Sequence, residues 1–124
     1  MKGKSTIVLT IEFIDPQLDA EERDQRVMNF IRELKEVDEV DKVSRVIDPN
    51  PPAGNKSFTS FLVGLLTAEL SFENAEKVFN ILKDRLRNKP IKLKIETSEK
   101  SLEVEVNNIE ELNLAIDAAK KFID

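Results

Sequence analysis

Two kinds of hydrophobic spacing alternate along this chain, and together they restrict its fold. In residues 6–13 the apolar side chains occupy every second position, a spacing typical of a β-strand. The same alternation occurs in residues 91–96 and 102–106, so we expect a hairpin with its turn around residues 98–101. Residues 40–47 predict a further strand with less regular alternation. The chain therefore contains strands that need a cover of helices on their apolar face.

Three segments carry apolar residues at the three- and four-residue intervals of amphipathic helices. Asp19 and Glu22 have the spacing of a capping box, which predicts the start of the first of these helices. A second helix is expected to begin at Ser71. Asn108 and Glu111 form another capping-box pattern ahead of the last helix.

One segment, residues 57–68, contains no charged residue. We interpret it as a fourth helix, apolar nearly all round and too short to span a bilayer. Such a helix is either sandwiched in the core or presents a surface for self-association or for a partner. The sequence leaves open whether the helix at residues 57–70 is fully buried. In the surface interpretation, residues 49–56 form a loop that controls access, and the contacts come from Phe58, Phe61, Leu62 and Leu65.

The predicted order of elements is β-α-β-α-α-β-β-α, which indicates an α/β fold of α+β type, a two-layer sandwich in a single domain of residues 1–124. We expect a four-stranded mixed sheet, with strand order 2-1-3-4, parallel crossovers and an antiparallel hairpin. In the hairpin, lysines at 92 and 94 and glutamates at 103 and 105 share one face, so that face meets water and the helices lie mainly on the other.

Composition argues against catalysis, because the chain has no His, Cys, Tyr or Trp. These residues supply most general bases, thiolate nucleophiles and soft metal ligands. The acidic clusters at residues 15–22 and 38–41 lie in polar sequence, where carboxylates stay solvated. We therefore expect no enzyme, no catalytic residues, no metal site and no cofactor.

Net charge and the lack of a targeting pattern limit the expected partners and compartment. The net charge of −5 argues against a protein that binds nucleic acid through its phosphates. The N-terminal residues lack the pattern of a signal peptide, and cysteine is absent, so we expect a cytoplasmic protein without membrane contact.

An alternative function is a regulatory domain that binds a ligand. Lys56 and Ser57 stand at the start of the helix expected at residues 57–68, where a small anion or nucleotide could be held. A phosphate-binding loop of the Walker type needs two glycines at a fixed spacing, and only one glycine, at position 54, stands just before these residues. Further cations lie at the basic end of the next helix, namely Lys83, Arg85, Arg87 and Lys89.

Five segments together resemble a known family. They are TIVLTI at 6–11, GNKSF at 54–58, LVGLL at 62–66, LKDRLR at 82–87, and the hairpin IKLKIE and SLEVEV at 91–96 and 101–106. Over roughly residues 6–120 this pattern resembles the effector-associated constant component family of bacterial conflict systems. The resemblance implies a small non-catalytic protein with an adaptor or regulatory role in bacterial defence. It also implies an enzymatic effector, protease-like or of TIR type, as a protein partner, and it supplies no catalytic residues. A homo-oligomer is the other possibility, and it follows from the apolar segment and not from the resemblance.

Overall fold

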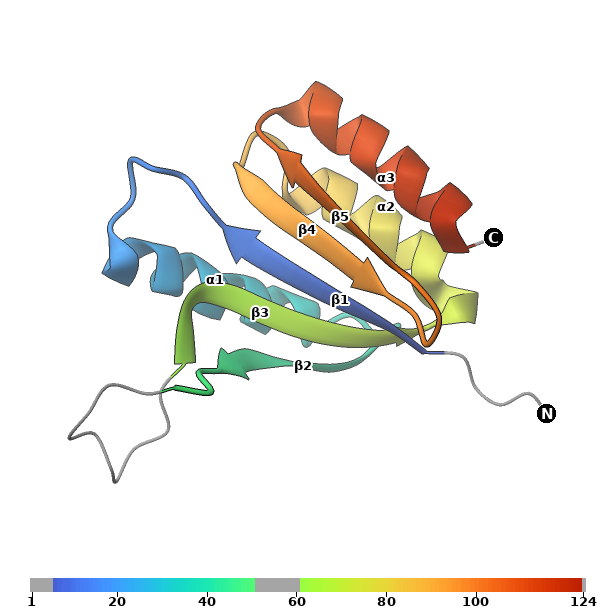
Figure 1. Cartoon of the computed structure of the whole chain (residues 1–124), viewed down its shortest axis with the longest axis horizontal. Helices are drawn as coiled ribbons and strands as arrows, with labels where there is room; N and C mark the ends of the chain where they lie inside the picture. The colour runs from blue at the N-terminus through green and yellow to red at the C-terminus, as the bar shows by residue number, and fades with distance from the viewer. Residues whose placement is uncertain (1–5, 51–60, 124) are drawn as a thin grey trace.

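Five strands and three helices make up the protein in a computed structural model that describes residues 6–50 and 61–123 (Figure 1). The strands are β1 (Thr6–Phe13), β2 (Val40–Ile47), β3 (Phe61–Ser71), β4 (Ile91–Glu96) and β5 (Ser101–Val106). The helices are α1 (Ala20–Leu34), α2 (Ala75–Arg85) and α3 (Ile109–Ile123), with a single 3₁₀ turn (Phe72–Asn74) leading into α2.

The strands form one sheet of order β2-β3-β1-β4-β5, in which all neighbours are antiparallel. The expected four-stranded mixed sheet is therefore wrong, although the four predicted strands keep their 2-1-3-4 order once β3 is inserted between the first two. Since β1 and β2 are each antiparallel to β3, they run in the same direction, and α1 connects them across β3. In the same way α2 connects β3 to β4 across β1, so the first four strands form a split β-α-β arrangement.

The charge-free segment is a strand and not the helix expected at residues 57–68. Over its second half the burial of β3 alternates strictly, with Gly64, Leu66, Ala68 and Leu70 buried. Both of its edges pair, with β1 on one side and β2 on the other. A central strand is covered more completely than an edge strand, which explains a run of residues without charge. The observed order is β-α-β-β-α-β-β-α.

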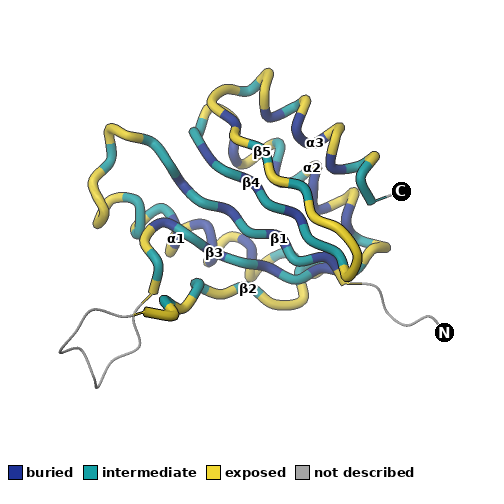
Figure 2. Tube along the Cα trace, viewed as in Figure 1, coloured by how far each residue is buried: buried dark blue, intermediate teal, exposed yellow. Residues whose placement is uncertain are grey.

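All three helices cover one face of the sheet and enclose a single core, which confirms the expected α+β class (Figure 2). α1 packs mainly on β3, whereas α2 and α3 pack on each other, with α3 also against β5. The predicted capping box of α1 is present: Asp19 Oδ1 accepts from the Glu22 N–H at 2.8 Å, and Glu22 Oε1 accepts from the Asp19 N–H at 3.0 Å. At the start of α3, Asn108 Oδ1 accepts from the Glu111 N–H at 2.9 Å.

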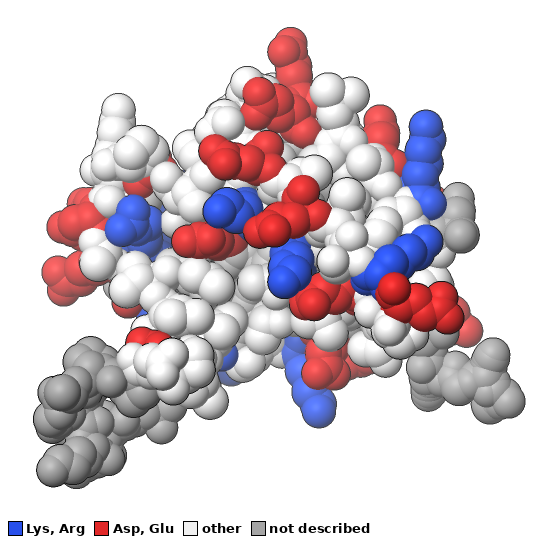
Figure 3. Space-filling view, in the orientation of Figure 1, with Lys and Arg blue, Asp and Glu red and all other residues white. Residues whose placement is uncertain are grey.

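Within residues 6–50 and 61–123, no helix covers the other face of the sheet, which we call the open face, and its side chains are mostly polar. Cross-strand neighbours form three rows there, for example Thr67, Thr10, Lys94 and Glu103 in the middle row. Lys92 lies opposite Glu105 in the hairpin, as the alternation predicted. Figure 3 shows the basic and acidic side chains interspersed over this face. Its charged residues are Glu12, Lys42, Glu69, Lys92, Lys94, Glu96, Glu103 and Glu105.

Candidate functional site

Three large hydrophobic side chains are exposed together where β2 ends and β3 begins. Ile47 is 61% exposed, Phe61 40% and Val63 42%. Ile47 and Phe61 are paired residues of the two strands, and Val63 is two positions further along β3. Single exposed hydrophobic residues are ordinary on protein surfaces, but a contiguous group indicates a contact surface. We call Ile47, Phe61 and Val63 the apolar tip.

A bend in β3 places the apolar tip, and α1 holds the bend. Gly64 has a φ of +75°, in the left-handed region that favours glycine. Its N–H donates to Asp24 Oδ1 of α1 at 2.9 Å, and the same oxygen accepts an ion-pair contact from Arg45 Nη2 of β2 at 2.8 Å. The Arg45 guanidinium carbon lies 4.7 Å from the centre of the Phe61 ring. One carboxylate therefore ties together the helix, the bend and the arginine that supports the exposed ring.

Asp24→Ala is expected to destabilise the protein by about 1–3 kcal/mol, because a partly buried N–H and a guanidinium lose their shared acceptor. Asp24→Asn keeps a carbonyl oxygen for the Gly64 N–H and is expected to cost under about 1 kcal/mol, the usual worth of an ion pair near the surface. Urea unfolding of the two variants checks this. Equal losses for both would contradict the role given to the Gly64 hydrogen bond.

The predicted contact residues fall in different places. Phe61 is on the surface, whereas Leu62 and Leu65 are half-buried. Phe58, Lys56 and Ser57 lie outside the described residues, as does most of the loop at 49–56. Sequence reasoning missed Ile47 and Val63, since it treated β3 as a helix and did not pair its start with β2.

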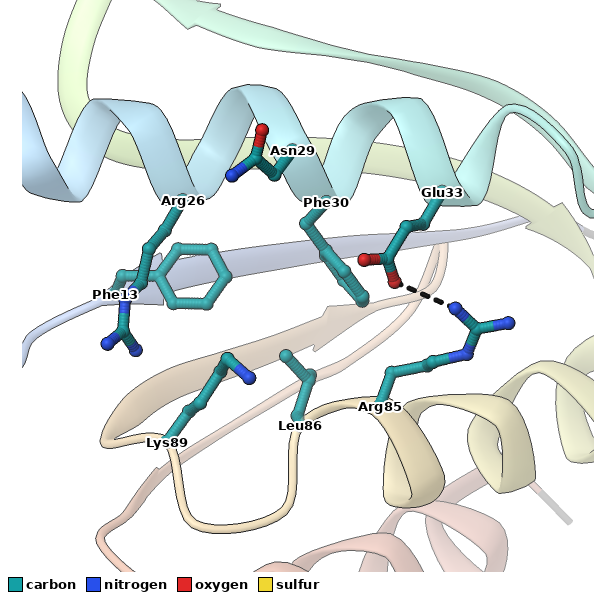
Figure 4. A pocket seen from close by; sticks show the side chains of 8 residues that line it. All are labelled: Phe13, Arg26, Asn29, Phe30, Glu33, Arg85, Leu86 and Lys89. Carbon is teal, nitrogen blue, oxygen red and sulfur yellow. Dashed lines mark hydrogen bonds and ion pairs between the residues drawn. The ribbon is translucent and has the colours of Figure 1, made fainter.

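A second candidate site is a groove between α1 and the C-terminal end of α2, with a volume of about 280 Å³. Its lining residues are Phe13, Arg26, Asn29, Phe30, Glu33, Arg85, Leu86 and Lys89 (Figure 4). The basic run predicted at the end of the second helix is divided in space. Arg85 and Lys89 line this groove, whereas Lys83 and Arg87 line a hollow beside Ile109 of α3.

Ion pairs tie α2 to α1 and to the segment just before β2. Arg85 Nη1 donates to Glu33 Oε1 at 2.9 Å, which ties α2 to α1. Lys77 Nζ donates to Glu39 Oε2 at 3.1 Å, and this hydrogen bond is the main cause that lowers the pKa of Glu39. Over residues 6–50 and 61–123, no three His, Cys, Asp or Glu side chains are grouped so that they could hold a metal ion.

No model of a known protein family gives a significant match to this chain, and no curated protein or solved structure does so either. The family resemblance drawn from the sequence therefore stays a hypothesis. Among the described helices, none has the length and apolar character needed to cross a membrane.

Proposed function

We propose that the protein is a non-catalytic adaptor that binds a protein partner through the apolar tip. The observation that carries this proposal is the position of Phe61. This aromatic ring is 40% exposed and rests against Arg45, while the other end of its strand supplies the core residues Leu66 and Leu70. A partner that covers the exposed part of Phe61 removes apolar surface from water, and this burial favours binding.

The geometry favours tight binding for two further reasons. Aromatic and arginine side chains provide much of the energy of protein interfaces, and here Phe61 and Arg45 lie together. Asp24 already fixes Arg45 by their 2.8 Å ion pair, so the ring and its support lose little conformational freedom on binding. Ile47, the strand partner of Phe61, and Val63, two positions further along β3, add exposed apolar area next to it.

The partner that fits this tip is a protein with an apolar pocket wide enough for one aromatic ring. The resemblance to the effector-associated family makes an effector enzyme encoded beside this protein, protease-like or of TIR type, the first candidate. A second copy of the chain is the other. Nucleic acid fits poorly, because the open face of the sheet carries more glutamates than lysines.

Phe61→Asp is expected to weaken partner binding at least tenfold, since a carboxylate would have to be desolvated in an apolar pocket. Leu114→Asp in α3 is the matched control, because Leu114 is 69% exposed but far from the tip in the sequence and on a different element. Both variants should keep the far-ultraviolet circular dichroism spectrum of the native protein. The measurement is co-purification with the proteins encoded next to it, together with sedimentation velocity for self-association.

Two results would contradict this proposal. In the first, the native protein sediments as a monomer and binds none of the neighbouring gene products. In the second, Leu114→Asp abolishes an observed complex as completely as Phe61→Asp, which would show that the apolar tip has no special part in it.

A further inference from the structure

We propose that the groove between α1 and α2 is a binding site for a small organic anion with an aromatic or other apolar body. The groove is separate from the apolar tip, and the proposal does not depend on the function assigned to the tip. It rests on the charges around the mouth of the groove and on the apolar side chains at its floor.

The charges at the mouth are unevenly balanced. Arg85 is neutralised by Glu33, at 2.9 Å. Within residues 6–50 and 61–123, neither Arg26 nor Lys89 forms an ion pair. Figure 4 shows these two side chains on the same side of the groove as Phe13, with the Glu33–Arg85 pair on the other side. Two cations that face one space without a counter-charge favour a ligand with a carboxylate or phosphate group.

Apolar side chains that are almost fully buried close the floor of the groove and show only their edges to it. Phe13 and Phe30 meet edge to face, with ring centres 6.2 Å apart, and Leu86 completes the floor. Arg26 and Lys89 above such a floor suit a ligand that has an acidic group at one end and a small apolar body at the other. The volume of about 280 Å³ is at the small end for ligand sites, which limits the body to about one ring.

Titration of the full chain, labelled with ¹⁵N, tests this inference by following its amide resonances. The probes are phenyl phosphate and benzoate, with inorganic phosphate and the neutral benzamide as controls. We expect saturable binding of phenyl phosphate or benzoate, with the largest shifts at amides of α1 and of residues 86–89. Inorganic phosphate and benzamide should each bind at least tenfold more weakly, because each lacks one half of the recognised chemistry.

Charge variants locate the binding. Arg26→Gln and Lys89→Gln are each expected to weaken it about tenfold, the usual effect of losing one charge-assisted contact. Lys42→Gln, on the open face of the sheet, removes the same charge elsewhere and should leave the affinity unchanged. Glu33→Gln frees Arg85 and should strengthen binding several-fold.

The inference is overturned if neither phenyl phosphate nor benzoate binds, or if the shifts map outside the groove. It is also overturned if either control probe binds as tightly as the best aromatic anion. A loss of affinity in Lys42→Gln equal to that in Arg26→Gln would show attraction by overall charge alone. Weaker binding by Glu33→Gln would contradict the part assigned to Arg85.

Discussion

Gly64→Ala is expected to destabilise the protein by about 2–3 kcal/mol, because a non-glycine residue is strained at positive φ and its Cβ would crowd a backbone oxygen. A Cβ atom at this position would lie 3.2 Å from the backbone oxygen of Phe13 and 3.5 Å from Cβ of Arg23. The contact with Arg23 is an ordinary one, whereas the Phe13 oxygen belongs to a paired strand and would have to give way. Equilibrium unfolding in urea measures the loss.

Whether Gly64→Ala lowers or raises the stability distinguishes the observed strand from the helix that the sequence suggested. In the interior of a helix, replacing glycine with alanine stabilises by about 1 kcal/mol. Thr67→Ala, on the open face of the same strand, is the control and should change stability by less than about 1 kcal/mol. A Gly64→Ala protein as stable as the native one, or more so, would refute the bend in β3.

Phe79→Ala is expected to cost about 3–5 kcal/mol, the usual loss for a large aromatic side chain removed from a core. Phe79 in α2 is fully buried, among the largest side chains of the core. Phe61→Ala should cost only about 1–2 kcal/mol, since Phe61 is already 40% exposed and the variant loses the contact with Arg45 and a partial burial. The pair is compared by urea unfolding under identical conditions.

Similar losses for the two phenylalanines would mean that Phe61 belongs to the core and is not available to a partner. A large loss for Phe79 with a small loss for Phe61 would separate the residue that folds the chain from the residue assigned to contact. The same comparison is a folding control for the binding experiment. If a Phe61 variant is stable but does not bind, unfolding cannot be the cause.

Local patterns predicted most of the fold correctly. β1 and the β4–β5 hairpin follow from alternation, and α1 follows from the capping box at Asp19 and a regular apolar stripe. β3 was missed because its first half, from Phe61 to Leu66, is apolar at nearly every position, which suits a buried helix as well as a strand. The alternation of Leu66, Ala68 and Leu70 with Thr67 and Glu69 carried the correct signal.

The sites were less predictable, because distant segments build them. The sequence pointed to Phe61 through its apolar surroundings, but the support from Arg45 depends on strand pairing and on Asp24 of α1. The basic residues from Lys83 to Lys89 are close in the sequence, but they line two separate hollows. Arg26, which completes the groove, belongs to another helix.

The central claim is that the apolar tip touches another protein, and site-specific photo-crosslinking tests it most directly. A benzophenone amino acid is placed at position 61 in one protein and at position 114 in another, and both are irradiated inside cells that express the neighbouring genes. Position 61 should give one dominant crosslinked product, identified by mass spectrometry as a neighbouring protein or a second copy, and position 114 should give none. No product at position 61, or the same product in equal yield from position 114, would contradict the claim.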